Sequence, residues 1–96
     1  MPHYVVLGNW TDQGIQNVKD SPKRFDRVKD LAAKFGGRAD VYITMGQYDF
    51  VGVMEMPNDE AVMQLVLQMG AQGNGRTTTL KAWTPEEATK VLAKLQ

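Results

Sequence analysis

Four stretches of the chain have strand-like sequence, at residues 4–7, 41–45, 48–56 and 76–83, and side chains of different character alternate along the second and third. An alternation with a period of two is typical of β-strands that bury one face. Gly8-Asn9 closes the first stretch, and Gly46-Gln47 separates the second from the third. Two alternating runs joined by a short link that contains glycine predict a β-hairpin.

Another segment repeats its apolar residues every three or four positions, which predicts an amphipathic helix. It begins at Ser21, the expected N-cap, with Pro22 in the first helical position, where a missing N–H costs nothing. Gly36-Gly37 ends it, and residues 14–19 are expected to form a shorter helical turn before it. Its apolar positions are Phe25, Val28, Leu31, Ala32 and Phe35.

Two further helices are expected. One opens at residues 57–60 and is ended by Gly70 and Gly73, and the other follows the capping-box pattern of Thr84 and Glu87 with Pro85 between them. Their apolar positions are Val62, Leu65, Val66 and Met69 in the first, and Ala88, Val91, Leu92 and Leu95 in the second.

The predicted order of elements is β-α-β-β-α-β with a closing helix. This order is that of the ferredoxin-like split βαβ plait, an α+β fold with a four-stranded antiparallel sheet and two helices on one face. We expect residues 1–96 to form a single domain, because a chain of this length has room for one core.

The two alternations of the predicted strands suggest what lies on each face of the sheet. We expect one set to pack beneath the helices: Val41, Ile43, Met45, Val51, Val53, Leu80 and Ala82. The other set is Tyr42, Thr44, Tyr48, Phe50, Met54, Thr77, Thr79, Lys81 and Trp83. Since this second set is too apolar for a solvated face and too polar for a dry core, it predicts a sheet-to-sheet homodimer or larger homo-oligomer.

Composition narrows the function classes. Eleven basic residues balance eleven acidic ones, so no net charge draws the chain to nucleic acid or to an anionic membrane. The absence of cysteine excludes disulfides, a thiolate nucleophile and zinc sites with sulfur ligands. Histidines and carboxylates show no metal-ligand spacing, so neither a metal nor another cofactor is expected. Without a signal peptide or a long apolar stretch, the expected location is the cytoplasm.

The sequence resembles the GYD domain family, which is named for the Gly-x-Tyr-Asp element found here as Gly46-Gln47-Tyr48-Asp49. The resemblance extends over nearly the whole chain, through residues 4–14, 21–24, 44–51 and 73–79. It implies a ferredoxin-like protein of the dimeric α/β-barrel type, and it assigns no catalytic residues. The same hairpin is also similar to the effector-binding domains of leucine-responsive regulators, which bind amino acids at subunit interfaces. The chain lacks their DNA-binding domain.

Several polar and aromatic residues are candidates for a binding site. Asn9 and Trp10 follow the first strand, where they either contact a ligand or, with Thr11, mark the entry to a helix. Tyr48 and Asp49 either line a pocket or serve the turn, in which case Asp49 accepts hydrogen bonds from nearby backbone N–H groups. The candidate ligand-binding set is Asn9, Trp10, Tyr42, Thr44, Tyr48, Asp49 and Arg76.

Charged residues have simpler interpretations. Arg76 could hold a carboxylate, either that of Asp49 or that of a ligand. His3, the single histidine, is expected to be solvated. Seven basic residues between Lys19 and Arg38 either form an anion-binding face or, because Asp20, Asp26 and Asp30 lie among them, pair along a solvated helix.

The sequence therefore favours a non-catalytic small-molecule-binding or interaction module that acts as a homo-oligomer. The alternative is a cofactor-free enzyme, similar to a monooxygenase or an isomerase, with a pocket between sheet and helices. Such an enzyme needs a titratable group in the pocket, for which Asp40, Asp49 and Lys81 are candidates. A purely structural oligomer is the third possibility.

Overall fold

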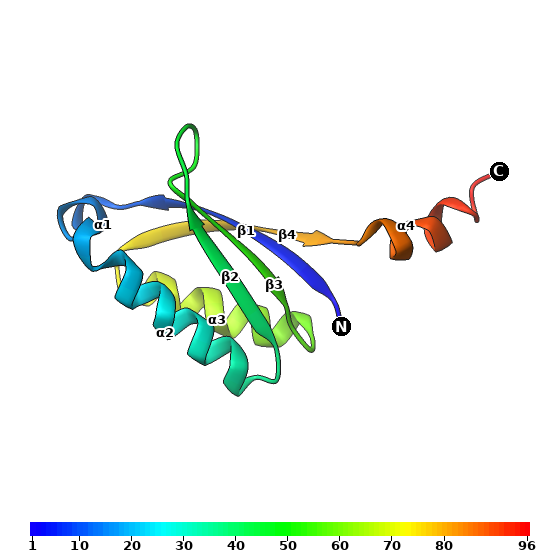
Figure 1. The fold of residues 1–96 in the computed structure, drawn as a ribbon, viewed down its shortest axis with the longest axis horizontal. Coiled ribbons are helices and arrows are strands. Elements are labelled where there is room, and N and C mark those ends of the chain that lie inside the picture. The colour runs from blue at the N-terminus through cyan, green and yellow to red at the C-terminus, as the bar shows by residue number, and fades with distance from the viewer.

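Four strands form one antiparallel sheet in the order β2-β3-β1-β4 in the computed structural model, which describes residues 1–96 (Figure 1). The strands are β1 (His3–Trp10), β2 (Arg38–Ile43), β3 (Phe50–Glu55) and β4 (Gly75–Ala82). The helices are α1 (Asp12–Gln16), α2 (Ser21–Lys34), α3 (Asp59–Ala71) and α4 (Pro85–Leu92), and a 3-10 turn spans Val18–Asp20. The predicted ferredoxin-like plait is confirmed, with α2 and α3 on one face of the sheet.

The predicted hairpin is present, but its link is longer than two residues. β2 ends at Ile43 and β3 begins at Phe50, so residues 44–49 form a loop that stands away from the sheet (Figure 1). Thr44 closes this loop, because its backbone N–H donates to the Asp49 carbonyl at 2.8 Å and its hydroxyl donates to the Tyr48 carbonyl at 2.6 Å. Gly46 has a φ of 114°, a conformation that other residues rarely adopt.

Ser21 is not the N-cap of α2, as the sequence predicted. The 3-10 turn leads directly into the helix, so the cap position falls on Asp20 and Ser21 has helical dihedral angles. Its hydroxyl is fully buried and accepts a hydrogen bond from Arg24 at 3.1 Å. The starts of the other two long helices agree with prediction, since Asn58 caps α3 and Thr84 forms a capping box with Glu87 at α4.

The predicted faces are wrong for β3 and β4. Phe50 and Met54 are 3% and 2% exposed and lie beneath the helices, whereas Val53 and Leu80 are 45% and 48% exposed on the opposite face. Pairing sets this arrangement, because Val5 of β1 lies opposite both Val53 and Leu80. For β2 the prediction was right in phase, although Ile43 is exposed and Met45 lies in the loop.

Apolar residues alternate on both sides of β3, and this explains the error. Phe50 and Met54 occupy one side of the strand, and Val51 and Val53 occupy the other. Period-two patterning cannot separate two apolar faces. The larger side chains are on the helix side, where their burial removes more apolar surface from water. There Met54 belongs to a core that includes Tyr4, Val6, Met56, Val62 and Leu65, and Phe50 packs against Trp10 and Phe25.

Helix α4 extends away from the rest of the chain (Figure 1). The molecule consequently measures 51 × 30 × 17 Å along its principal axes. His3 joins this helix to the sheet: its Nδ1 lies 3.3 Å from Glu87 of α4, and its Nε2 lies 2.9 Å from Glu55 of β3. His3 is thus not the solvated residue that the sequence predicted. None of the helices has the length and apolar character needed to cross a membrane.

Candidate functional site

Three aromatic rings meet at one end of the sheet, beneath the start of α2. The ring centroids of Trp10 and Phe50 are 4.8 Å apart, those of Phe25 and Phe50 are 5.5 Å apart, and Trp10 stacks on Phe25 at 5.9 Å. These separations are in the range of favourable aromatic contacts. Phe50 is buried, whereas Trp10 and Phe25 are partly exposed.

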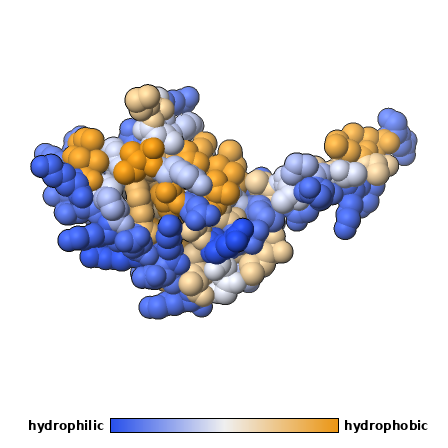
Figure 2. All heavy atoms as spheres, viewed as in Figure 1, coloured by the Kyte–Doolittle hydropathy of each residue, from blue (hydrophilic) through white to orange (hydrophobic).

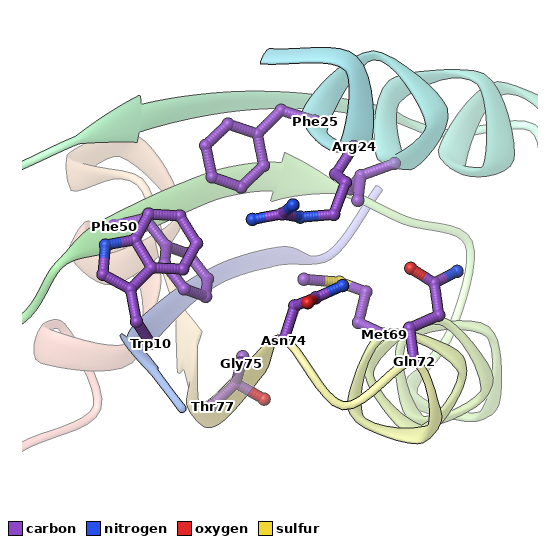
Figure 3. A pocket seen from close by; sticks show the side chains of 10 residues that line it. Trp10, Arg24, Phe25, Phe50, Met69, Gln72, Asn74, Gly75 and Thr77 are labelled. Carbon is purple, nitrogen blue, oxygen red and sulfur yellow. The ribbon is translucent and has the colours of Figure 1, made fainter. Parts of the chain in front are cut away.

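The rings form one wall of a small hollow between the sheet, α2 and α3. Figure 3 shows the aromatic rings toward one side of this pocket, Gln72 and Asn74 toward the other, and the Arg24 guanidinium between them, reaching toward the rings. Met69 of α3 and the backbone of Gly75 also line it. We call this hollow the aromatic pocket.

Arg24 is the ionisable residue among those that line the aromatic pocket. Its guanidinium lies over the Trp10 ring at 5.7 Å from the ring centroid, which is a cation–π arrangement. Nη1 donates to the Asn17 carbonyl at 3.0 Å, and Nη2 donates to the Ser21 hydroxyl at 3.1 Å. Arg24 is therefore held in place by the turn before α2, with part of its donor edge unused.

Two polar hollows adjoin the aromatic pocket along α2, and Arg24 lines all three. Lys23, Arg27 and Lys34 contribute further cations to them. Of the two interpretations of the basic residues, the one with ion pairs along this helix is not supported, because no ion pair forms within α2. The ion pairs of the structure instead join His3 to Glu55 and Glu87, Arg38 to Glu55, and Lys81 to Asp59. The basic face of α2 is thus uncompensated by direct contacts.

Most of the candidate residues predicted from the sequence lie together, but around the 44–49 loop rather than in the aromatic pocket. The Asn9 side chain donates to the Gln47 carbonyl at 2.9 Å. Asp49 accepts the backbone N–H of Trp10 at 2.8 Å, and its own N–H donates to the Gly8 carbonyl at 2.8 Å. These contacts match the interpretation in which Asp49 serves the turn by binding backbone N–H groups.

The remaining candidates are spread over other surfaces. Trp10 alone of the predicted set lines the aromatic pocket. Tyr42 is 60% exposed and pairs with Val51 on the face of the sheet opposite the helices. Arg76 lies at the start of β4, opposite Asn9 of β1, and not beside Asp49. The structure therefore does not bring Tyr42 and Arg76 into a site with Trp10.

Sequence reasoning missed Arg24, Phe25 and Phe50 as a group. Phe25 was assigned to a helix stripe and Arg24 to the basic cluster, and the two are adjacent in the chain. A signal was available, because a cation next to an aromatic residue in the first turns of a helix can reach the same end of the sheet as Trp10.

The chain is similar to known proteins over nearly its whole length. The sequence model of the GYD domain matches residues 4–92. This chain belongs to the GYD domain family. A relative in Thermus thermophilus, named glutamine synthetase and cystathionine beta-lyase binding protein, is 34% identical over 84 residues, which are 85% of this chain and 88% of the relative.

Solved structures agree with the fold of this GYD domain. A crystal structure of a Thermus thermophilus protein superposes with a TM-score of 0.55 at 24% identity, covering 88% of this chain and 95% of that one. The crystal structure of FFRP-DM1 superposes with a TM-score of 0.57 at 15% identity, covering 86% of this chain and 100% of the other. At these identities the likeness shows the fold alone.

A polar cluster separate from the aromatic pocket joins β1, α3 and β4 on the helix side of the sheet. The Tyr4 hydroxyl of β1 donates to Asp59 of α3, and Lys81 of β4 lies 3.1 Å from the same carboxylate. Burial, followed by the bond to Asp59, raises the pKa of Tyr4 to about 12. The hydrogen bond from Tyr4 and then that from Lys81 lower the pKa of Asp59. The cluster therefore keeps the phenol protonated.

The sheet face away from the helices carries exposed apolar side chains. Tyr42, Val53 and Leu80 are 60%, 45% and 48% exposed. Figure 2 shows hydrophobic residues gathered over the strands and a second group on the protruding helix. On α4 and the residue pair before it, Trp83, Val91 and Leu92 are all more than half exposed. We call the sheet face that carries Tyr42, Val53 and Leu80 the open face.

Proposed function

We propose that this GYD-domain protein is a non-catalytic interaction module that acts as a homo-oligomer and binds other proteins. The observation that carries the proposal is the open face, where Val5, Val53 and Leu80 lie side by side across three strands. Contiguous exposed apolar surface of this kind marks interaction sites in proteins. The name of the Thermus thermophilus relative, a binding protein for two enzymes, supports the same conclusion.

In the proposed assembly, the open faces of two copies pack against each other. Helix α4 has an apolar side formed by Ala88, Val91 and Leu92 together with Trp83 just before the helix, and within its own chain this side covers nothing. The helix is separated from β4 by only Trp83 and Thr84, which leaves little chain for it to fold back over its own sheet. It extends instead toward the second copy.

The cofactor-free enzyme has less support. Asp40, Asp49 and Lys81, the titratable candidates from the sequence, do not line the aromatic pocket. Lys81 pairs with Asp59, and Asp49 binds the Trp10 backbone. The geometry thus gives the pocket a cation and several rings, which suit binding better than proton transfer.

Light scattering on the purified chain tests the homo-oligomer. We expect a dimer or larger species at micromolar concentrations, and a monomer when Val53→Glu and Leu80→Glu are combined, since two charges on each copy would be buried without partners. Leu67→Glu is the matched control, because Leu67 is 62% exposed on α3, away from the open face, and this variant is expected to remain oligomeric. A monomeric native chain would overturn the oligomer.

Binding to enzymes is tested separately by surface plasmon resonance with purified glutamine synthetase and cystathionine β-lyase. We expect saturable binding of at least one enzyme by the native chain. If neither enzyme shows saturable binding, the proposal that this chain binds the same partners as its relative is contradicted. This outcome holds even if the chain is oligomeric.

A further inference from the structure

We infer that the aromatic pocket is a binding site for a small aromatic carboxylate, with Arg24 binding the carboxylate and the rings of Trp10 and Phe25 contacting the aromatic group. The site lies on the helix side of the sheet, so it does not depend on the interaction surface proposed above.

The shape of the pocket favours a single ring. Phe50 forms its floor and is 3% exposed, whereas the partly exposed Trp10 and Phe25 leave ring surface available to a ligand. Backbone approaches closely at Gly75, where an added Cβ would lie 3.0 Å from the Phe50 ring. The hollow opens to solvent beside these rings, so a small planar ligand can reach their exposed surface.

The charge of the pocket favours a monoanion. Arg24 donates one N–H each from Nη1 and Nη2 to the Asn17 carbonyl and the Ser21 hydroxyl, which leaves three of its five N–H donors without a partner in a residue that lines the hollow. A planar guanidinium binds a carboxylate well because its N–H groups match the spacing of the two oxygens. Lys23, Arg27 and Lys34 line the adjoining hollows without ion pairs, while Asp20 and Asp30 are the acidic residues there. This excess of positive charge attracts an anion to the mouth of the pocket.

A second donor stands opposite the rings. Asn74 accepts a hydrogen bond from the Gln13 side chain at 3.0 Å through its Oδ1, which leaves the amide N–H groups of Asn74 as donors. Since Asn74 also lines the pocket, these groups can bind the second carboxylate oxygen. The pocket thus offers an aromatic wall, one cation and one amide donor to a single ligand.

The intrinsic fluorescence of Trp10 provides the test. Trp83 is the other tryptophan and is 57% exposed beside α4, so Trp83→Phe leaves Trp10 as the reporter. In that background benzoate is titrated beside benzyl alcohol, its neutral analogue, and cyclohexanecarboxylate, its non-aromatic analogue. We expect a saturable change with benzoate at a Kd roughly tenfold lower than that of either analogue, as expected when one charge-assisted contact or one ring contact is lost.

Variants assign the preference to Arg24. In Arg24→Gln we expect benzoate to bind no better than benzyl alcohol. Lys29→Gln, on the same helix but outside all three hollows, is the matched control and is expected to keep the native preference. If Arg24→Gln fails to fold because the Asn17 and Ser21 contacts are lost, the inference is still tested by comparing the affinities of the three ligands for the Trp83→Phe chain. Equal affinity for benzoate and benzyl alcohol, or no saturable change up to the solubility of benzoate, would overturn the inference.

Discussion

At the scale of single residues, the position of Phe50 depends on glycines that leave room for its ring. Gly8 lies directly opposite Phe50 in the β1–β3 pairing, and a Cβ at Gly8 would overlap the ring. Gly75 approaches the same ring from β4. Because Phe50 contacts both Trp10 and Phe25, these glycines also position the walls of the aromatic pocket.

Replacing Gly8 by alanine is therefore expected to destabilise the protein. The added methyl group must displace a buried ring, and overpacking of this kind costs about 1–3 kcal/mol. The loss corresponds to a fall of roughly 4–8 °C in the unfolding temperature for each kcal/mol, measured by circular dichroism. Gly52→Ala is the matched control, since Gly52 is also a buried strand glycine but its Cβ would meet Met54 at 3.6 Å and Val6 at 3.8 Å, which are ordinary contacts. Equal effects of the two substitutions would contradict this account of Phe50.

At the scale of elements, local patterns predicted the strands and helices well, whereas pairing decided the faces. The capping box, glycine stops and helical stripes were sufficient for the order β-α-β-β-α-β and for the fold. The face of β3 was not predictable, because Phe50 and Val51 are both apolar and the choice depends on Gly8 in another strand. The aromatic pocket was missed for the same reason, since Trp10, Arg24 and Phe50 come from three elements.

The cluster that joins β1, α3 and β4 makes the protein less stable as the pH becomes strongly alkaline. The pKa of Tyr4 is raised to about 12 in the folded chain, above the value of about 10 for an exposed tyrosine. Its contribution to stability is complete below about pH 10 and is lost as pH rises toward about 12, because the unfolded chain loses the proton first. We expect the unfolding temperature to fall over this interval, and to fall less steeply in Tyr4→Phe.

Differential scanning fluorimetry between about pH 8 and pH 12 measures this difference in slope. Tyr42→Phe is the control, since Tyr42 is 60% exposed and lies outside the cluster. The same slope in the native chain and in Tyr4→Phe would show that the phenol of Tyr4 does not couple ionisation to folding.

At the scale of the whole molecule, the shape itself is informative. The Cα radius of gyration is 14.5 Å, whereas a compact chain of this length has a value of about 12.5 Å. The excess comes with α4, which is attached through the His3–Glu87 contact and otherwise projects from the sheet (Figure 1). An amphipathic helix is seldom stable with its apolar side in water, so this helix requires a surface to cover.

If α4 covers the second copy in the proposed dimer, its apolar side contributes to association and little to the folding of its own chain. Combining Val91→Ser with Leu92→Ser is expected to raise the dissociation constant of the dimer about tenfold or more, since each side chain would lose burial worth on the order of 1 kcal/mol. Sedimentation over a dilution series measures this constant, and circular dichroism checks that the sheet remains folded. Lys90→Ser is the matched control, because it also places a serine in α4 but on the charged side of the helix. It is expected to leave the dissociation constant of the dimer nearly unchanged. A native dimer that is unaffected by the double substitution would show that two open faces associate without α4, and that the apolar side of this helix binds a different protein or none.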